Sequence, residues 1–185
     1  MTLHQLTLHQ PTPRRPLICH PGDGRKFEVA GMTLIIKAPG GESTAPFTLY
    51  EAQIPPHFAA LSAHVHYITT EWFYVISGTL AFTLDDETVM ARAGSFLAVA
   101  PGVVHTFWNP TATAATVLGA QSRPDFAEYL ASLSTLLATT SWPPADMTPL
   151  HRLAAQYDQF VPGEHYSPAS EDGVVPVHGS SQAAM

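Results

Sequence analysis

Short segments of alternating apolar and polar residues, each closed by turn residues, constrain the fold of this chain more than any other feature. They lie at residues 27–36 (interrupted at Gly31), 47–54, 71–77, 79–84, 88–92, 95–100, 105–109 and 115–121. A period of two is typical of β-strands with one buried face. The 17 prolines and 12 glycines supply the turns between them. Seven or eight such strands predict a β-sandwich or β-barrel.

The pattern changes after residue 122, where apolar residues recur every three or four positions. This period predicts an amphipathic helix over residues 124–137, with Pro124 and Asp125 in its first turn. Thr148 and Pro149 suit the N-cap and first position of a second, shorter helix that runs through Tyr157. We interpret both helices as a cover for the barrel or a dimer contact, rather than as carriers of catalytic residues.

The chain accordingly divides into four parts. Residues 1–20 are polar and proline-rich without a clear period, so we expect an N-terminal arm. Residues 21–122 contain the strand-like segments and form the predicted barrel, and residues 123–160 form the helical appendage. Residues 161–185 are rich in Ser, Gly, Ala and Pro, a composition that predicts a flexible tail.

Charge and composition argue against several classes of partner. The formal net charge is −7 and the eight Lys and Arg residues form no basic stripe, so we expect no nucleic-acid partner. No apolar run approaches the length of a membrane span, so we expect no membrane partner. Cys19 is the only cysteine, which excludes an internal disulfide and makes the reducing cytoplasm the expected location.

Three histidines and a glutamate form the candidate functional site: His64, His66, Glu71 and His105. Imidazole and carboxylate groups together suit a divalent transition metal ion. His64 and His66 are two residues apart, so on a strand their side chains share one face. Glu71 follows His66 by five residues and on a continuous strand would face the other way. A turn or bulge within residues 67–70 must therefore reset the register if Glu71 is a ligand.

The spacing of these residues resembles the two motifs of the cupin superfamily. The first motif, His-x-His followed by Glu and Gly, is matched by His64, His66, Glu71 and Gly78. The second, Gly, Pro-x-Gly, His and Asn, is matched by Gly94, Gly102, His105 and Asn109. Two structural positions depart from the pattern: Phe58 stands where the first motif begins with glycine, and Ala100 where the second has proline. The resemblance covers about residues 47–121.

The resemblance implies an all-β fold, the cupin double-stranded β-helix or jelly-roll barrel, here with a short helical C-terminal appendage. It also implies that His64, His66, Glu71 and His105 bind one divalent transition metal ion. The sequence does not select among Fe, Mn, Ni, Co, Cu and Zn, because affinity follows the metal series more than the ligands. A small-molecule substrate and a homodimer are expected.

The single-domain plan with C-terminal helices resembles bacterial monocupins of the quercetin-2,3-dioxygenase-like group. That resemblance implies a dioxygenase acting on a flavonol-like or other enediol or phenolic compound, with Glu71 accepting the substrate proton. One alternative is a redox-neutral, metal-dependent isomerase, cyclase or lyase acting on a carbonyl compound. Another is a ligand-binding cupin without turnover. Cupin folds host all of these, so the fold does not choose among them.

Several side chains in or near the two motifs have candidate roles of their own. Glu71 can be a permanent ligand or a general base. Asn109 is expected to form structural hydrogen bonds rather than bind metal. Tyr50 and Tyr67 are candidate hydrogen-bond donors in a pocket. Four aromatic residues can line a cavity or simply fill the barrel, and we favour filling: Phe73, Phe82, Phe96 and Phe107.

Overall fold

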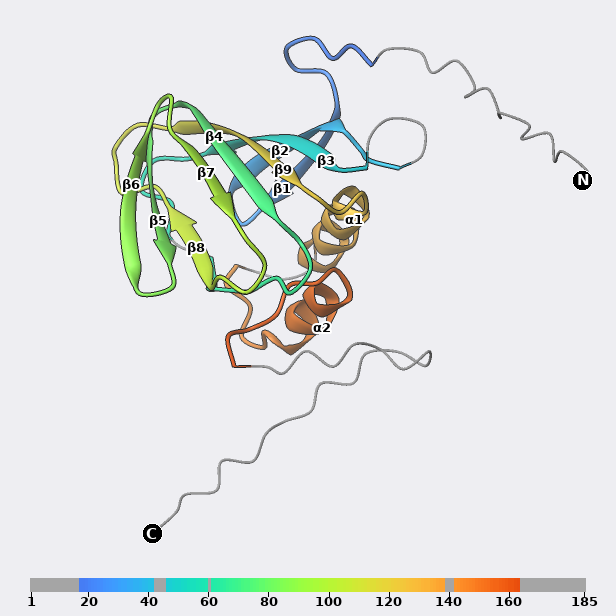
Figure 1. The fold of residues 1–185 in the computed structure, drawn as a ribbon. Coiled ribbons are helices and arrows are strands. Elements are labelled where there is room, and N and C mark those ends of the chain that lie inside the picture. The colour runs from blue at the N-terminus through green and yellow to red at the C-terminus, as the bar shows by residue number, and fades with distance from the viewer. Residues whose placement is uncertain (1–16, 42–45, 60, 139–141, 164–185) are drawn as a thin grey trace, which may run out of the picture.

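Two antiparallel sheets face each other in the computed structural model, which describes residues 17–41, 46–59, 61–138 and 142–163 (Figure 1). The larger sheet has six strands, in the spatial order β1 (Arg25–Val29), β2 (Met32–Ala38), β3 (Thr48–Ile54), β9 (Ala115–Gln121), β4 (Glu71–Ser77) and β7 (Phe96–Val99). The smaller sheet has three, in the order β6 (Glu87–Arg92), β5 (Thr79–Leu84) and β8 (His105–Trp108). The strands match the predicted segments, with residues 27–36 divided into two strands that form a hairpin.

The turn between β4 and β5 carries the chain from the larger sheet to the smaller one. Gly78 occupies this turn with φ +78°, a conformation that glycine adopts without strain. A Cβ at this position would lie 2.7 Å from Ala115 Cα, so there is no room for a side chain. The closing glycine of the first motif is therefore needed for the fold, and it sets where β4, which begins with Glu71, crosses to the second sheet.

Inward-facing apolar side chains of both sheets fill the space between them. Ring centroids of Phe73 and Phe82 are 5.3 Å apart, and those of Phe82 and Phe107 are 5.8 Å apart. Phe58, where the first motif begins with glycine, adds a fourth ring at 6.2 Å from Phe107. These rings fill the barrel as predicted. Phe96 does neither of the expected things, because it faces outward from β7 and is 63% exposed.

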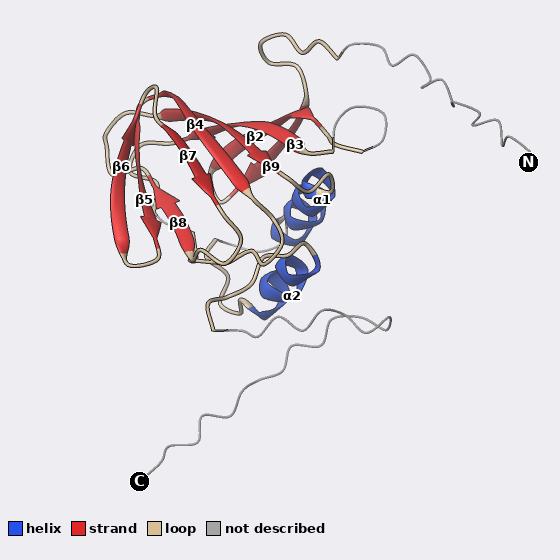
Figure 2. Ribbon diagram, viewed as in Figure 1, coloured by secondary structure: helices blue, strands red, loops and turns tan. Residues whose placement is uncertain are grey.

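The two helices follow β9 and lie on the same side of the barrel, as Figure 2 shows. They are α1 (Phe126–Leu137) and α2 (Thr148–Gln156). Phe126 at the start of α1 packs on Tyr50 of β3, with ring centroids 5.1 Å apart. The prediction for the start of α2 is wrong by one residue: Met147 is the N-cap and Thr148 is the first helical residue. Asp146 lies one residue before this N-cap, and its carboxylate accepts a hydrogen bond from the Thr148 amide, so the chain turns into the helix one residue earlier than predicted.

The predicted fold class is confirmed: two antiparallel sheets form a cupin-type β-barrel, followed by two short helices. Most of the predicted N-terminal arm (residues 1–16) and of the predicted tail (residues 164–185) lies outside the described residues.

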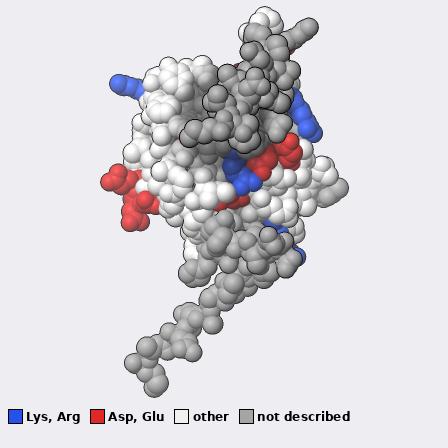
Figure 3. Space-filling view, turned by 45° about the vertical axis from the view of Figure 1, so that its right-hand side comes forward, with Lys and Arg blue, Asp and Glu red and all other residues white. Residues whose placement is uncertain are grey.

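Charged side chains are sparse on the face shown in Figure 3, where most of the described surface is uncharged. Some of the charges are paired: Lys37 Nζ lies 3.5 Å from a Glu51 carboxylate oxygen, and Arg123 forms an ion pair with Asp125. Within the described part of the chain, neither helix has the length and apolar character needed to cross a membrane.

Candidate metal centre

The first and last histidines of the site lie side by side, His64 in a segment outside the named strands and His105 at the start of a strand. His64 and His105 form an antiparallel bridge in which each amide donates to the other's carbonyl, at 3.0 and 2.8 Å. His105 begins β8 and is also paired with Leu84 of β5. The backbone therefore fixes these two residues independently of the loop that follows His66.

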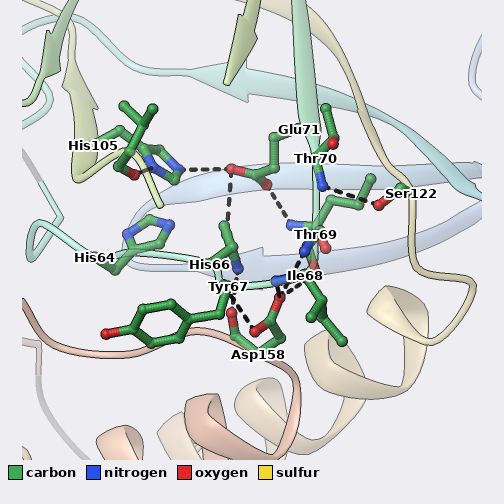
Figure 4. Close-up of polar contacts among 12 residues, drawn as sticks. His64, His66, Tyr67, Ile68, Thr69, Thr70, Glu71, His105, Ser122 and Asp158 are labelled. Carbon is green, nitrogen blue, oxygen red and sulfur yellow. Dashed lines mark hydrogen bonds and ion pairs between the residues drawn. The ribbon is translucent and has the colours of Figure 1, made fainter. Parts of the chain in front are cut away.

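All four predicted ligands come together inside the barrel. One candidate ligand atom from each of His64, His66, Glu71 and His105 lies within 4.8 Å of the others. His66, Glu71 and His105 are buried, with exposed fractions of 3%, 4% and 2%, and His64 is partly exposed. Figure 4 shows the three rings and the carboxylate around a common centre. A group of this composition could bind one transition metal ion.

The three imidazole rings share one hydrogen-bonding arrangement. In each, Nδ1 is within hydrogen-bonding reach of a backbone carbonyl oxygen: Ser62 for His64 (3.2 Å), Asp158 for His66, and Val103 for His105 (3.0 Å). A ring that donates from Nδ1 has its lone pair on Nε2, the arrangement that metal-binding histidines use. His66 Nε2 is buried and has no hydrogen-bond partner among the described residues. A buried nitrogen of this kind fits the role of a metal ligand.

The electrostatics of the site keep donors available for a cation. Burial, together with the neighbouring His105, lowers the pKa of His64 to about 3, so this ring is neutral near pH 7. Burial by itself opposes ionisation of Glu71, but contacts with His105 and His66 outweigh it and hold the pKa of Glu71 well below its ordinary value. Burial opposes the charged form of His66 as well, and the Glu71 carboxylate outweighs it and raises the pKa of His66. Glu71 and His66 thus favour each other's charged forms across the centre of the site.

Gln121 holds the glutamate in place, and the sequence analysis did not identify it. Glu71 Oε2 is 2.8 Å from His105 Nε2 and 3.5 Å from His66 Nε2, on the side of the three rings. Gln121 Nε2 donates a hydrogen bond to the other oxygen, Oε1. Gln121 is paired in register with Glu71 across β9 and β4, and it is buried. The sequence did indicate that Gln121 faces inward, because the alternation over residues 115–121 places this polar residue on the inner face of the strand.

The predicted register reset between His66 and Glu71 is present, and a residue from the helical appendage supports it. Residues 67 and 68 form a bend outside any strand, and β4 begins at Glu71. The Asp158 carboxylate accepts hydrogen bonds from the amides of Tyr67, Ile68 and Thr69 at 3.0, 2.9 and 2.8 Å. No pattern in the sequence pointed to Asp158, which lies 92 residues beyond His66.

The remaining candidates have distinct places. Asn109 is structural as predicted: its amide donates to the Pro55 and Thr113 carbonyls, and its oxygen accepts from the Thr111 amide and hydroxyl.

Tyr50 is buried on the inner face of β3. It lies opposite Gly119, where a Cβ would be 2.2 Å from the Tyr50 ring, so that glycine makes room for it. Tyr67 packs against Phe160 instead, with ring centroids 5.2 Å apart.

Comparison with known proteins gives one family match, and it lies over the site. Residues 50–119 match the model of the cupin domain (Cupin_2). The matched segment contains all four candidate ligands and both motifs. This match supports the cupin superfamily, and it agrees with the barrel described above. No curated protein sequence matches the chain.

Solved structures also show similarity to part of this chain. One is a proposed sugar phosphate isomerase from Acidithiobacillus ferrooxidans, with 21% identity and a TM-score of 0.38; the match covers 40% of this chain and 49% of that one. Another is the polyketide cyclase RemF from Streptomyces resistomycificus, with 20% identity, a TM-score of 0.48 and coverage of 56% and 77%. A third is a Cupin 2 conserved barrel domain protein from Salinispora arenicola, with 18% identity, a TM-score of 0.47 and coverage of 66% and 98%. The chain thus spans about half the length of the first of these structures.

Proposed function

We propose that this protein is a metal-dependent enzyme that acts on a small molecule with an enediol or phenolic hydroxyl group, and that it does so as a dioxygenase. The observation that supports metal dependence is the convergence of His64, His66, Glu71 and His105, in which the buried Nε2 of His66 makes no hydrogen bond to any described residue. The choice of a dioxygenase rests on the resemblance to quercetin-2,3-dioxygenase-like monocupins. A small-molecule substrate and a homodimer remain predictions from the sequence.

The metal ion, when bound by these four residues, supplies Lewis acidity and, if it is redox-active, electron transfer to dioxygen. The protein contributes the arrangement around it. Three histidines and one glutamate leave one or two coordination positions open. The buried surroundings, with Phe73, Phe82 and Phe107 on the inner faces of the strands, keep bulk water away and strengthen electrostatic contacts there.

Glu71 is the proposed proton acceptor. Its Oε2 faces the histidines and its Oε1 is tied to Gln121, so the carboxylate has a fixed orientation. The substrate O–H bond would break, the proton would pass to Glu71, and the electron pair would stay on the substrate oxygen. The pKa of Glu71 lies well below its ordinary value, so the carboxylate is ionised before this transfer. A low pKa also makes it a weak base, so the O–H group that Glu71 deprotonates would have to be acidified by the Lewis acid.

Tyr50 is the proposed hydrogen-bond donor to a second substrate oxygen. Its side chain lies on the inner face of β3, and its hydroxyl has no hydrogen bond within the described ranges. Burial and the nearby charge of Glu71 hold the pKa of Tyr50 well above its ordinary value, so the phenol stays protonated and able to donate. Tyr50→Phe is expected to raise KM for a flavonol while the metal content stays at that of the wild type.

Oxygen consumption tests the proposal directly. The freshly purified protein is analysed for metals, stripped with a chelator, and reloaded separately with Fe²⁺, Mn²⁺, Ni²⁺, Co²⁺, Cu²⁺ or Zn²⁺. Oxygen uptake is then measured with a flavonol as substrate, and redox-inactive Zn²⁺ serves as the matched control. Uptake with at least one redox-active ion and none with Zn²⁺ is the expected result.

Two outcomes would contradict the dioxygenase. Turnover that is unchanged under strict anaerobiosis would indicate the redox-neutral reaction instead. Binding of the flavonol to every metal form without any product would indicate a ligand-binding module. The variant Glu71→Gln separates the two roles of this residue: retained metal with lost turnover indicates a base, whereas loss of both indicates a mainly coordinating role.

A further inference from the structure

We propose that Asp158, in the segment that follows α2, is a positioning residue for the metal site. Its carboxylate fixes the loop that turns Glu71 towards the histidines, and its backbone carbonyl orients His66. The helical appendage would then be part of the site rather than a cover for the barrel. This inference rests on the proposed metal site and adds a residue to it from the other end of the described chain.

The carboxylate of Asp158 is fully engaged by one loop. Besides the three consecutive amides of residues 67–69, its Oδ2 accepts a hydrogen bond from Thr69 Oγ1 at 2.7 Å. Asp158 is only 4% exposed, and no Lys or Arg pairs with it among the described residues. Three adjacent N–H dipoles and a hydroxyl therefore compensate its charge, which binds the loop and the carboxylate to each other.

The backbone of the same residue reaches the metal site directly. His66 Nδ1 donates to the Asp158 carbonyl oxygen, which turns His66 Nε2 towards Glu71 and the other rings (Figure 4). Two residues later, Phe160 forms an antiparallel bridge with Val65, the residue between the two histidines, with N···O distances of 2.9 and 3.0 Å. The chain after α2 thus contacts the motif both before and after His66.

The backbone conformation of Asp158 makes this double contact possible. Its φ is +61°, in the left-handed region that aspartate tolerates better than most residues, and it directly follows the C-cap of α2. The amides of Asp158 and Gln159 bond back to the carbonyls of Ala155 and Ala154, at 3.3 and 3.1 Å. The left-handed turn at the end of α2 places the side chain and the carbonyl of one residue against the same loop.

The contacts of Asp158 fall on one half of the site only. His64 and His105 are held by their own bridge, whereas Asp158 contacts His66 and the loop before Glu71. Without the carboxylate, three buried or partly buried amides lose their hydrogen-bond acceptor. The turn at residues 67–69, which sets the direction of Glu71, then loses the side chain that fixes its backbone. Loss of Asp158 should therefore change the geometry and affinity of the metal site even in protein that stays folded.

Cobalt binding to the full chain tests this inference. Asp158→Asn is compared with the wild type and with Asp125→Asn, which removes the same charge from an aspartate paired with Arg123 at the start of α1. Affinity is measured by titration with Co²⁺, ligand geometry by the visible absorption spectrum of bound Co²⁺, and the folded fraction by circular dichroism. We expect about 10- to 100-fold weaker binding and an altered spectrum for Asp158→Asn, and wild-type values for Asp125→Asn.

A purely structural role would lower the melting temperature of Asp158→Asn but leave the affinity and spectrum of its folded fraction unchanged, and that result would overturn the inference. If Asp158→Asn does not fold, Thr69→Val decides, because it removes only the hydroxyl bond to Asp158. Thr69→Val should bind Co²⁺ several-fold more weakly and Thr69→Ser should bind like the wild type; equal affinity in Thr69→Val would overturn the inference. Failure of the wild type to bind Co²⁺ would instead refute the proposed metal site itself.

Discussion

The two halves of the metal site are built in different ways. His105 lies in a regular strand, paired with Leu84 on one side and bridged to His64 on the other. His66 and Glu71 flank an irregular loop whose amides bind a carboxylate 92 residues away from His66. The backbone of the barrel thus fixes one half, and the chain that follows α2 adds support to the other half. In this protein, backbone pairing places two of the ligands, and a side chain from outside the barrel helps to place the other two.

The largest effect is expected from removing a ligand of either half. His66→Ala and His105→Ala each remove one nitrogen that would bind the metal ion. Both variants should therefore lose more Co²⁺ affinity than the roughly 100-fold that is lost when a residue hydrogen-bonded to a ligand is removed. Isothermal titration with Co²⁺ and metal analysis of the purified variants measure this loss. The exposed His20 supplies the control variant, His20→Ala.

Equal losses in the two variants would show that the halves differ in construction but not in their importance for binding. Wild-type metal content in either variant would exclude that histidine from the site and remove the basis of the comparison.

Asn109 tests the barrel half, and its effect should fall on stability. It is 1% exposed and takes part in four hydrogen bonds that close the loop after β8. Asn109→Ala leaves several buried groups without partners, so we expect a loss of about 3 kcal/mol in the free energy of unfolding. Urea denaturation of the metal-free protein measures it. Thr111→Val removes one of these bonds, together with the exposed contacts between the same hydroxyl and Thr113, and should lose about 1 kcal/mol.

The Co²⁺ affinity of folded Asn109→Ala should stay close to that of the wild type, because His105 is still held by β5 and by His64. A large loss of affinity would mean that the barrel half also depends on a loop, against the contrast drawn here.

The same contrast explains what the sequence could and could not predict. Spacing placed His64 and His66 on one face, and the odd step to Glu71 required a turn within 67–70, which the structure contains. Regular alternation also located the strands that carry Glu71 and His105. Asp158 follows no such rule, because a contact between distant segments leaves no local period. Gln121 lies between these cases: its inward position was predictable, but its partner was not.

Gln121 provides a smaller and more specific test, since it holds Glu71 from the barrel side while Asp158 holds the preceding loop. Gln121→Leu keeps the size of the side chain but removes the donor to Glu71 Oε1. We expect Co²⁺ affinity to fall by about 10- to 100-fold. Because both residues act on Glu71, the double variant with Asp158→Asn should lose less than the sum of the two single losses in free energy. Additive losses would mean that Gln121 and Asp158 position the glutamate independently.

The smallest effect is expected from Ser122, which also touches the irregular loop. Its hydroxyl oxygen accepts a hydrogen bond from the Thr70 amide at 3.0 Å, next to Glu71 and just beyond the three amides that Asp158 binds. Ser122→Ala removes one bond of a partly buried amide, so it should lose about 1 kcal/mol in the free energy of unfolding, measured by urea denaturation. Its Co²⁺ affinity should change less than that of Thr69→Val, because the Asp158 contacts remain and the backbone of Ser122 still donates to the Thr70 carbonyl. A larger loss of affinity in Ser122→Ala than in Asp158→Asn would mean that β9 and the residues after it fix the loop more than Asp158 does. Both halves of the site would then be positioned by the barrel alone.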